Sequence, residues 1–119
     1  MIAANTITKS NLYASMSEAE LQRRIATMAA QYGWLYFHDA DSRKNSVKIG
    51  DVKLGKGFLD TVLCKPPRFL IVECKREKGQ LTKEQWIWLQ ALRDSGIDAQ
   101  IWRPSYLPDI EEILKMEVK

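Results

Sequence analysis

The stretch FLIVECKRE, residues 69–77, constrains the fold of this chain most strongly, because it joins an apolar run to charged residues. Four consecutive apolar residues are typical of a strand in the middle of a sheet. Side chains alternate along a strand, which predicts one face with Phe69, Ile71, Glu73 and Lys75 and the other with Leu70, Val72 and Cys74. Burying a carboxylate and an ammonium group is costly, so a core strand that keeps Glu73 and Lys75 needs a chemical reason.

The length of the chain predicts a single domain. With 119 residues it is long enough for one core and too short for two. Residues 1–15 are small and polar, and we expect a flexible N-terminal arm followed by one domain over residues 16–119. The formal net charge of +3 permits nucleic acid as a partner without requiring it.

Two features of the sequence bear on the compartment. No apolar stretch approaches the length that crosses a bilayer, and the first residues lack the layout of a signal peptide. Cys64 and Cys74 are too few for a disulfide framework and lack zinc-ligand spacing. We therefore expect a cytoplasmic protein with reduced cysteines and no membrane partner.

Apolar periodicity and capping residues predict seven elements. Ser17 is a suitable N-cap for the first helix, and Thr82 for the second. The predicted order is helix 17–32, strands 34–38, 58–64 and 68–75, a helix after Thr82 that ends at Gly96, a strand from 98, and a helix over 107–116. Residues 41–57 are polar, basic and rich in glycine, which favours a mobile loop. This order predicts an α/β fold, a mixed sheet with helices packed on it.

The position of two prolines brings a second acid opposite Glu73. If residues 58–75 form a hairpin centred between Pro66 and Pro67, facing residues have numbers that sum to 133, and Asp60 lies opposite Glu73 at about 5 Å between Cβ atoms. Prolines cannot supply the positive φ angles of a tight turn, so we expect a longer loop, and an odd slip in register would separate the two acids. Like charges so close together require a nearby cation.

Two carboxylates and a lysine on one sheet surface match the needs of a hard divalent cation. Mg²⁺ takes oxygen ligands, commonly one or two carboxylates with water, and often acts on phosphate substrates. Lys75 would then lie close to the attacking water or the scissile phosphate. The spacing D-x12-E-x-K is the pattern of the PD-(D/E)xK nucleases, although short matches of this kind also occur by chance.

The flanking residues make the match more specific. From about Ser17 to Leu114 the chain resembles the VRR-Nuc branch of that superfamily, in particular its small stand-alone phage and prophage type. The resemblance is carried by SEAELQ, GWLYFHDADSR, GKGFLD, IVECKREKGQLTKEQWIWLQALRDSG and AQIWRP. It implies a restriction-endonuclease-like core. Leu59 stands where the family usually has proline, a residue that shapes backbone and does no chemistry.

The resemblance also implies roles for individual residues. Asp60 and Glu73 correspond to the metal ligands, with the Cys74 backbone carbonyl as a third, and Lys75 to the residue that orients the attacking water. Gln85 corresponds to a helix glutamine beside the site. It has a competing role, because it also fits a capping box with the N-cap of its helix.

The first helix offers two candidate acids. Glu18 shares the inward face with Leu21 and Ile25, whereas Glu20 groups with the outer residues and fits a capping box with Ser17. We therefore choose Glu18 as the second-site acid, and the family pattern of an acid three residues before LQ agrees.

Polar residues near the predicted site have two interpretations. A lone histidine at a strand end is more often a surface residue than a catalyst, and lysines in a loop usually form a solvated face. Beside a nuclease site they are also suitable phosphate contacts, which position a backbone without reading sequence. The candidate DNA contacts are His38, Ser42, Arg43, Lys44, Lys48, Lys53 and Lys56.

These observations together predict a divalent-metal-dependent DNA endonuclease that uses Mg²⁺, with Mn²⁺ as a substitute. By resemblance its substrate is branched DNA such as a Holliday junction, and its location is the host cytoplasm if a phage encodes it. Two symmetric cuts favour a homodimer. Three alternatives stay open: a catalytically silent nucleic-acid-binding module, a nicking or restriction-like nuclease without junction preference, and an interaction domain in which Glu73 and Lys75 form an exposed ion pair on an edge strand, worth at most about 1 kcal/mol.

Overall fold

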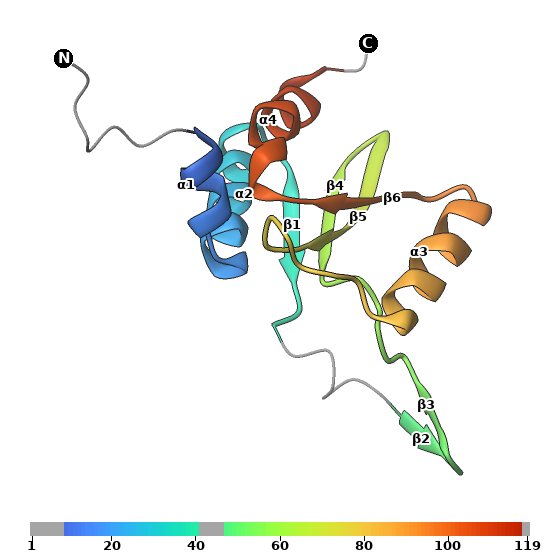
Figure 1. The fold of residues 1–119 in the computed structure, drawn as a ribbon. Coiled ribbons are helices and arrows are strands. Elements are labelled where there is room, and N and C mark those ends of the chain that lie inside the picture. Colours follow the sequence, from blue (N-terminus) through green and yellow to red (C-terminus); the bar gives the residue numbers. More distant parts are fainter. Residues whose placement is uncertain (1–8, 41–46, 118–119) are drawn as a thin grey trace, which may run out of the picture.

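The computed structural model describes residues 9–40 and 47–117. Within these ranges four strands form a mixed sheet in the order β1-β4-β5-β6, and two more form a separate ribbon, β2–β3 (Figure 1). Strands β1, β4 and β5 are antiparallel, and β6 runs parallel to β5. The strands are β1 (Leu35–His38), β2 (Val47–Ile49), β3 (Val52–Leu54), β4 (Thr61–Lys65), β5 (Arg68–Cys74) and β6 (Asp98–Trp102).

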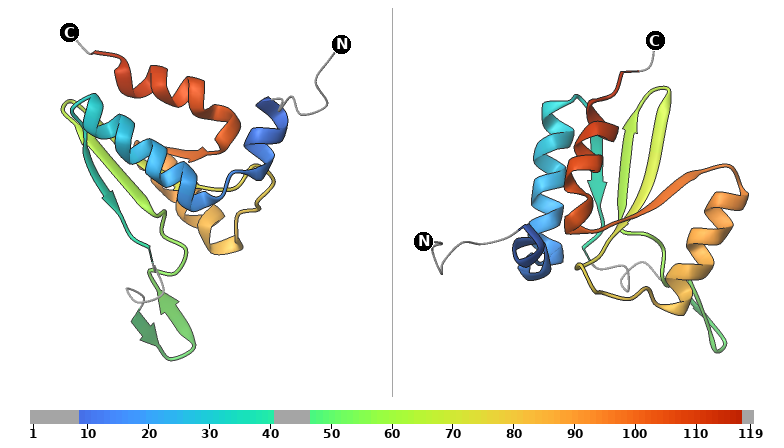
Figure 2. Two further views of the ribbon diagram at one scale, coloured as in Figure 1. Left: turned by 90° about the vertical axis from the view of Figure 1, so that its left-hand side faces the viewer. Right: turned by 45° about the horizontal axis from the view of Figure 1, so that its top comes forward.

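Helices cover both faces of the sheet, as the α/β prediction requires. Helices α2 and α4 lie side by side on one face, and α3 lies on the other (Figure 1 and Figure 2). The helices are α1 (Lys9–Ser15), α2 (Glu18–Gln31), α3 (Lys83–Asp94), the 3₁₀ helix η2 (Pro104–Tyr106) and α4 (Leu107–Lys115). None of these is long and apolar enough to cross a membrane.

The alternation predicted for β5 is confirmed by two separate apolar clusters. Leu70, Val72 and Cys74 pack with α2 and α4, in a cluster that also holds the buried Trp34 and Trp102. On the opposite face, the smaller cluster under α3 contains Leu59, Ile71, Leu89 and Ala99. Glu73 follows Ile71 on this second face, so its carboxylate lies at the edge of an apolar cluster.

The predicted helix boundaries are also confirmed. The Ser17 hydroxyl accepts a hydrogen bond from the Glu20 amide, and Thr82 and Gln85 form a complete capping box at the start of α3. Gly33 and Gly96, both at φ 81°, follow the ends of these helices and adopt the left-handed conformation that glycine allows.

Two segments differ from the sequence-based expectation. Residues 9–15, expected in a flexible arm, form α1, and the following Met16 is buried against the main core; residues 1–8 lie outside the described range. The seven residues of α1 are too few to give a clear helical period. Within the expected loop 41–57, β2 and β3 pair around Gly50, whose φ of 60° suits a tight hairpin.

The register of the central hairpin is confirmed, although the predicted turn is wrong. Thr61 faces Val72 and Lys65 faces Arg68, so facing numbers sum to 133. The pair Lys65 and Arg68 leaves only two residues for the turn, Pro66 and Pro67, with a cis peptide bond between them. No described residue other than glycine needs a positive φ. The expected longer loop, and the slip that it would allow, are therefore absent from this hairpin.

The turn between the ribbon and β4 depends on Gly57. Its φ is 83°, and a Cβ atom there would lie 2.5 Å from the Glu84 Cβ and 2.6 Å from the Glu84 carbonyl carbon. Substitution therefore forces either the backbone or the start of α3 to move. We predict that Gly57→Ala lowers the free energy of unfolding by about 2 kcal/mol or more, measured by urea denaturation.

A matched control for this prediction is Gly50→Ala at the tip of the ribbon. Gly50 also has a positive φ, of 60°, but nothing lies within 4 Å of the position that a Cβ atom would take there. The control should cost only the backbone strain of about 1 kcal/mol. Equal losses for the two variants would show that the contact with Glu84 does not matter.

Candidate active site

The two predicted acids meet at the end of the central strands. Asp60 directly precedes β4 and Glu73 lies near the end of β5, where the observed register places them opposite each other. Glu73 is 4% exposed, and among the described residues its Oε1 atom has no hydrogen-bond partner. A buried carboxylate oxygen without a partner is unfavourable, so the site is incomplete without a further ligand.

The surroundings of the acid pair disfavour two negative charges. Burial, followed by the charge of Asp60, raises the pKa of Glu73 to about 8, and the nearby Lys75 opposes this rise. Burial also raises the pKa of Asp60, although hydrogen bonds from Thr61 and Cys74 and the proximity of His38 oppose the rise. A bound cation would remove the conflict, because it favours the ionised form of both acids.

Lys75 lies beside Glu73 but does not neutralise it fully. Its Nζ atom is 4.0 Å from the Glu73 Oε2 atom, and the two side chains are 12% and 5% exposed. The alternative of an exposed ion pair on an edge strand is therefore wrong. Strand β5 is central, between β4 and β6; Glu73 is buried and Lys75 is half-buried.

A chain of hydrogen bonds fixes the Asp60 carboxylate from the side of α2. The Tyr36 hydroxyl donates to Gln22 Oε1 at 2.6 Å, and Gln22 Nε2 donates to the Thr61 hydroxyl at 2.7 Å. The Thr61 hydroxyl in turn donates to Asp60 Oδ1 at 2.8 Å, and the Cys74 amide approaches the same oxygen at 3.4 Å. Each donor points toward Asp60, so Oδ1 is held as an acceptor, and Oδ2 lies 3.8 Å from His38 Nε2.

Gln22, Thr61 and Tyr36 were not predicted from the sequence. Gln22 and Thr61 are buried polar residues, 7% and 0% exposed, and burial raises the pKa of Tyr36 to about 12. A signal was present for Gln22, because it follows Leu21 on the inward face of α2, where a polar residue needs a partner. The identity of that partner depends on how α2 packs across the sheet and could not be found from spacing.

The loop after Lys75 is fixed by Arg103, another residue that was not predicted from the sequence. Arg103 Nη1 donates to the carbonyl oxygens of Arg76, Glu77 and Gly79 at 2.8, 3.1 and 2.7 Å. The Lys75 amide also donates to the Trp102 carbonyl at 3.0 Å. These contacts attach the loop to the end of β6 and restrict the direction of the Lys75 side chain.

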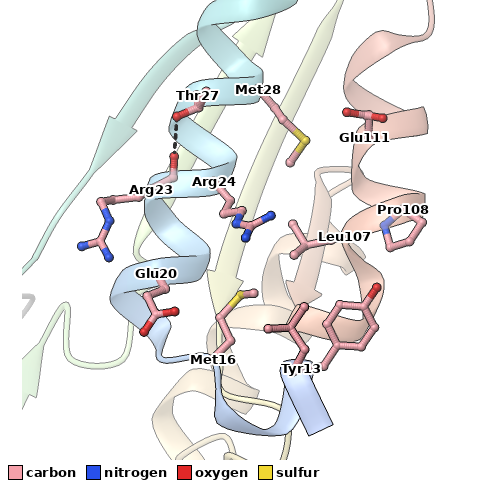
Figure 3. A pocket seen from close by; sticks show the side chains of 11 residues that line it. Tyr13, Met16, Glu20, Arg23, Arg24, Thr27, Met28, Leu107, Pro108 and Glu111 are labelled. Atoms are coloured by element: carbon pink, nitrogen blue, oxygen red, sulfur yellow. Dashed lines mark hydrogen bonds between the residues drawn. The ribbon is translucent and has the colours of Figure 1, made fainter. Parts of the chain in front are cut away.

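The two candidate acids of α2 lie on different sides. Glu18 is exposed, and its charge contributes to the raised pKa values of Asp60 and Glu73, so its carboxylate lies within electrostatic range of the acid pair. The Ser17 hydroxyl donates a hydrogen bond to Glu20 Oε1 at 3.3 Å. Glu20 also lines a groove of about 920 Å³ together with residues of α1 and α4 (Figure 3). The groove contains none of the predicted site residues, and Glu20 is exposed.

The remaining predicted residues take different positions. His38 lies next to the site, with Nε2 at 3.8 Å from Asp60 Oδ2. The Gln85 side-chain oxygen accepts a hydrogen bond from the Thr82 amide at 2.9 Å, so Gln85 caps the start of α3 in this structure. Its side chain is half-buried on the face of α3 that also carries Leu89. No hydrogen bond joins Gln85 to the acid pair within the described residues.

The basic residues predicted to contact DNA are only partly described. Lys48 is exposed on β2, and Lys56 pairs with Glu84 at 3.5 Å. Lys53 lies in β3, opposite Lys48. Ser42, Arg43 and Lys44 lie outside the described residues.

The donor set fits a divalent cation of the Mg²⁺ class. In the described part of the chain, no group of three or more His, Cys, Asp or Glu side chains is placed to hold a metal. Mg²⁺ needs fewer protein ligands, because it keeps several waters and binds one or two carboxylates with substrate phosphate. Asp60 and Glu73 supply two carboxylates, and the free Glu73 Oε1 is available as a ligand. The Cys74 thiol is unsuitable, since burial raises its pKa well above the ordinary value and keeps it protonated.

Comparison with protein families gives a match. A family model described as the VRR-NUC domain matches residues 8–105, which include α1 and every candidate site residue. No curated protein and no solved structure matches the chain.

The raised pKa of Glu73 predicts a pH dependence of stability. Between its ordinary value of 4.5 and about 8, the folded metal-free protein keeps a proton that the unfolded chain loses, so stability falls as pH rises through this window. We predict that the free energy of unfolding in EDTA is lower at pH 9 than at pH 6 by about 3 kcal/mol. Urea denaturation at the two pH values measures the difference.

The variant Glu73→Gln should remove most of this dependence, because glutamine does not titrate. Glu112→Gln is the matched control, since Glu112 is an exposed acid that pairs only with Lys115 on α4 among the described residues. If the free energy of unfolding of Glu73→Gln depended on pH as strongly as that of the wild type, the titration of buried Glu73 would not be the cause of this dependence.

The hydrogen-bond chain predicts a separate effect of Gln22→Leu. The variant leaves the Thr61 and Tyr36 hydroxyls without Gln22 and should cost about 1–3 kcal/mol of stability. Because the Asp60 carboxylate loses its support, Mn²⁺ affinity measured by calorimetry should fall by about 10–100-fold.

The control Trp34→Phe removes another buried hydrogen bond, from Trp34 Nε1 to the Leu114 carbonyl at 2.8 Å. Trp34 precedes β1 at the end of that strand that lies away from Asp60. The control should lower stability without weakening Mn²⁺ binding. If both variants weaken Mn²⁺ binding equally, the effect is one of general stability.

Proposed function

The chain belongs to the VRR-NUC domain family, nucleases of the PD-(D/E)xK type, and from this premise we propose that it is a divalent-metal-dependent DNA endonuclease acting on branched DNA. The observation that carries the proposal is the buried acid pair of Asp60 and Glu73, with one carboxylate oxygen unpaired among the described residues and Lys75 alongside. The fold could form without two buried carboxylates. Burying them lowers the stability of the protein, and a role in metal binding explains why they are kept.

The residues of the site divide the work of phosphodiester hydrolysis. Asp60 and Glu73 would hold Mg²⁺, or Mn²⁺ in its place, with the Cys74 carbonyl as a further ligand. When bound, the ion neutralises negative charge that develops on the phosphate oxygens and acidifies water. Lys75 orients the attacking water, and the Thr61 hydroxyl keeps Asp60 in position. Glu18 adds negative charge at the rim of the site, where it suits a second cation.

Other residues would position the substrate. His38 lies at the rim of the site beside Asp60 and is suited to a phosphate contact. Gln85 would move between its capping contact and the site. A cytoplasmic location and a phage origin stay predictions from the sequence. The remaining phosphate contacts that we assign are Lys48, Lys53 and Lys56 along the ribbon and its connection to β4, and, from the sequence alone, Ser42, Arg43 and Lys44.

A homodimer is supported by an apolar surface beside the site. Leu35, Phe37 and Phe69 are 71%, 62% and 42% exposed, and the strand register places them on one face of the sheet, the face that α3 covers only in part. Such a contiguous apolar surface favours association with another protein surface. A second copy of the chain would cover it and supply the second active site that paired cuts require.

The proposed function is tested by cleavage of labelled four-way junction, splayed-arm and linear duplex DNA in Mg²⁺, Mn²⁺ or EDTA. Wild-type protein should cut branched DNA faster than linear duplex and only with metal. Asp60→Asn and Lys75→Met should lower the rate by about 10²–10⁴-fold while DNA binding in EDTA is retained, because both act on the chemical step.

Glu112→Gln is the control acid for this experiment, as it lies on α4 outside the site. It should cut like the wild type. Equal turnover by wild type and Asp60→Asn would contradict the assignment of the site. If the wild type binds every DNA but cuts none, the chain is a catalytically silent nucleic-acid-binding module.

A further inference from the structure

The β2–β3 ribbon projects away from the body of the protein (Figure 1 and Figure 2). One of its sides is apolar and exposed. Val47 faces Leu54 across the ribbon, and Ile49 follows Val47 on the same side by strand alternation. Their side chains are 58%, 50% and 62% exposed in the order Val47, Leu54 and Ile49. Three large apolar residues thus share one side of a projecting element.

Among the ribbon residues whose side chains are described, none covers this apolar side. Each strand has three residues, and an isolated two-stranded hairpin of any length is at best marginally stable in water. Scattered apolar residues on a surface need no explanation, but a contiguous group on a projecting element indicates a binding surface. The ribbon is therefore expected to be covered when the protein functions.

The base of the ribbon is fixed against α3. Trp88 Nε1 donates to the Lys56 carbonyl at 3.1 Å, and the Trp88 ring meets Phe58 edge to face at 4.9 Å between centroids. Gly57 lies in contact with Glu84, where a Cβ atom would not fit. Since Asp60 is only three residues beyond Gly57, the ribbon has a defined position relative to the acid pair.

The charge of the ribbon indicates the kind of partner. Residues 47–57 contain three lysines and one aspartate, and Lys48 is exposed on β2, where alternation places it opposite to the apolar side. A basic element with an apolar face suits a polyanion that also exposes flat apolar surfaces. DNA has both at a branch point, where the terminal base pairs lose a stacking neighbour.

We propose that Val47, Ile49 and Leu54 cover the base faces exposed at a DNA branch point, while Lys48 contacts an adjacent phosphate. The ribbon is then the element that distinguishes branched DNA from linear duplex, whose interior base pairs are stacked on both sides. This inference rests on the proposed function for the assignment of DNA as substrate, and it adds the residues that select the branched form.

Binding in EDTA tests the proposal without any cleavage. The probes are a fluorescent splayed-arm DNA and a linear duplex of the same length, measured by anisotropy with wild type and Ile49→Ser. We expect Ile49→Ser to weaken splayed-arm binding about tenfold and duplex binding less than twofold, because the duplex exposes base faces only at its two ends. A 2-aminopurine at the branch should change its fluorescence with wild type and respond less to the variant.

Two controls separate this effect from charge and from surface hydrophobicity in general. Ile87→Ser makes the same substitution at a residue of α3 that is 58% exposed, and it should leave both affinities unchanged. Lys48→Ala should weaken binding to both DNAs equally and reduce the slope of log affinity against log salt by about 1. Thermal unfolding of Ile49→Ser should match the wild type, since the ribbon lies outside both apolar clusters.

Three outcomes would overturn the proposal. Ile49→Ser could leave splayed-arm binding unchanged, or weaken both DNAs equally. The Ile49→Ser protein could also sediment with half the mass of the wild type while it still prefers branched DNA. That result would show that the ribbon contacts a second copy of the chain. Because cleavage is not measured, an inactive wild type that shows the selective loss would contradict the proposed nuclease function and leave this inference intact.

Discussion

The structure depends on one unfavourable interaction, the burial of the Glu73 carboxylate opposite Asp60. Burial and the neighbouring charge raise the pKa of Glu73 to about 8, and the carboxylate oxygen Oε1 finds no hydrogen bond within the described residues. Proteins rarely keep such a group unless it binds a ligand. The rest of the fold holds this pair in place at a cost to stability that the two apolar clusters offset.

Three contacts from different parts of the chain fix the geometry of the acid pair. The hairpin register sets Asp60 opposite Glu73, and the donor chain from Tyr36 through Gln22 and Thr61 holds Asp60 Oδ1 as its acceptor. Arg103 fixes the loop that follows Lys75. Sites built on central strands and supported by such contacts are more precise than sites on loops, which suits a chemistry that needs metal, water and phosphate in line.

Much of this arrangement follows from the sequence, since it depends on local rules. Strand alternation separated Glu73 from Leu70 and Val72, and the Pro66–Pro67 position predicted the register. Capping residues predicted the ends of α2 and α3. The parts that could not be predicted depend on contacts distant in sequence. Helix α1 is too short to show a period, and the ribbon resembles a loop in sequence because its strands have only three residues each around Gly50 and Asp51. The partner of Gln22 is 39 residues away and is reached only when α2 packs on the sheet.

The central claim is that Asp60 and Glu73 bind a divalent cation together, and crystals soaked in Mn²⁺ test it most directly. We predict an anomalous difference peak with carboxylate oxygens of both residues at about 2.1 Å, one of them Glu73 Oε1. The peak should disappear in Glu73→Gln crystals. An empty site in the wild type, with Glu73 hydrogen-bonded to Lys75 or water at the same Mn²⁺ concentration, would contradict the claim.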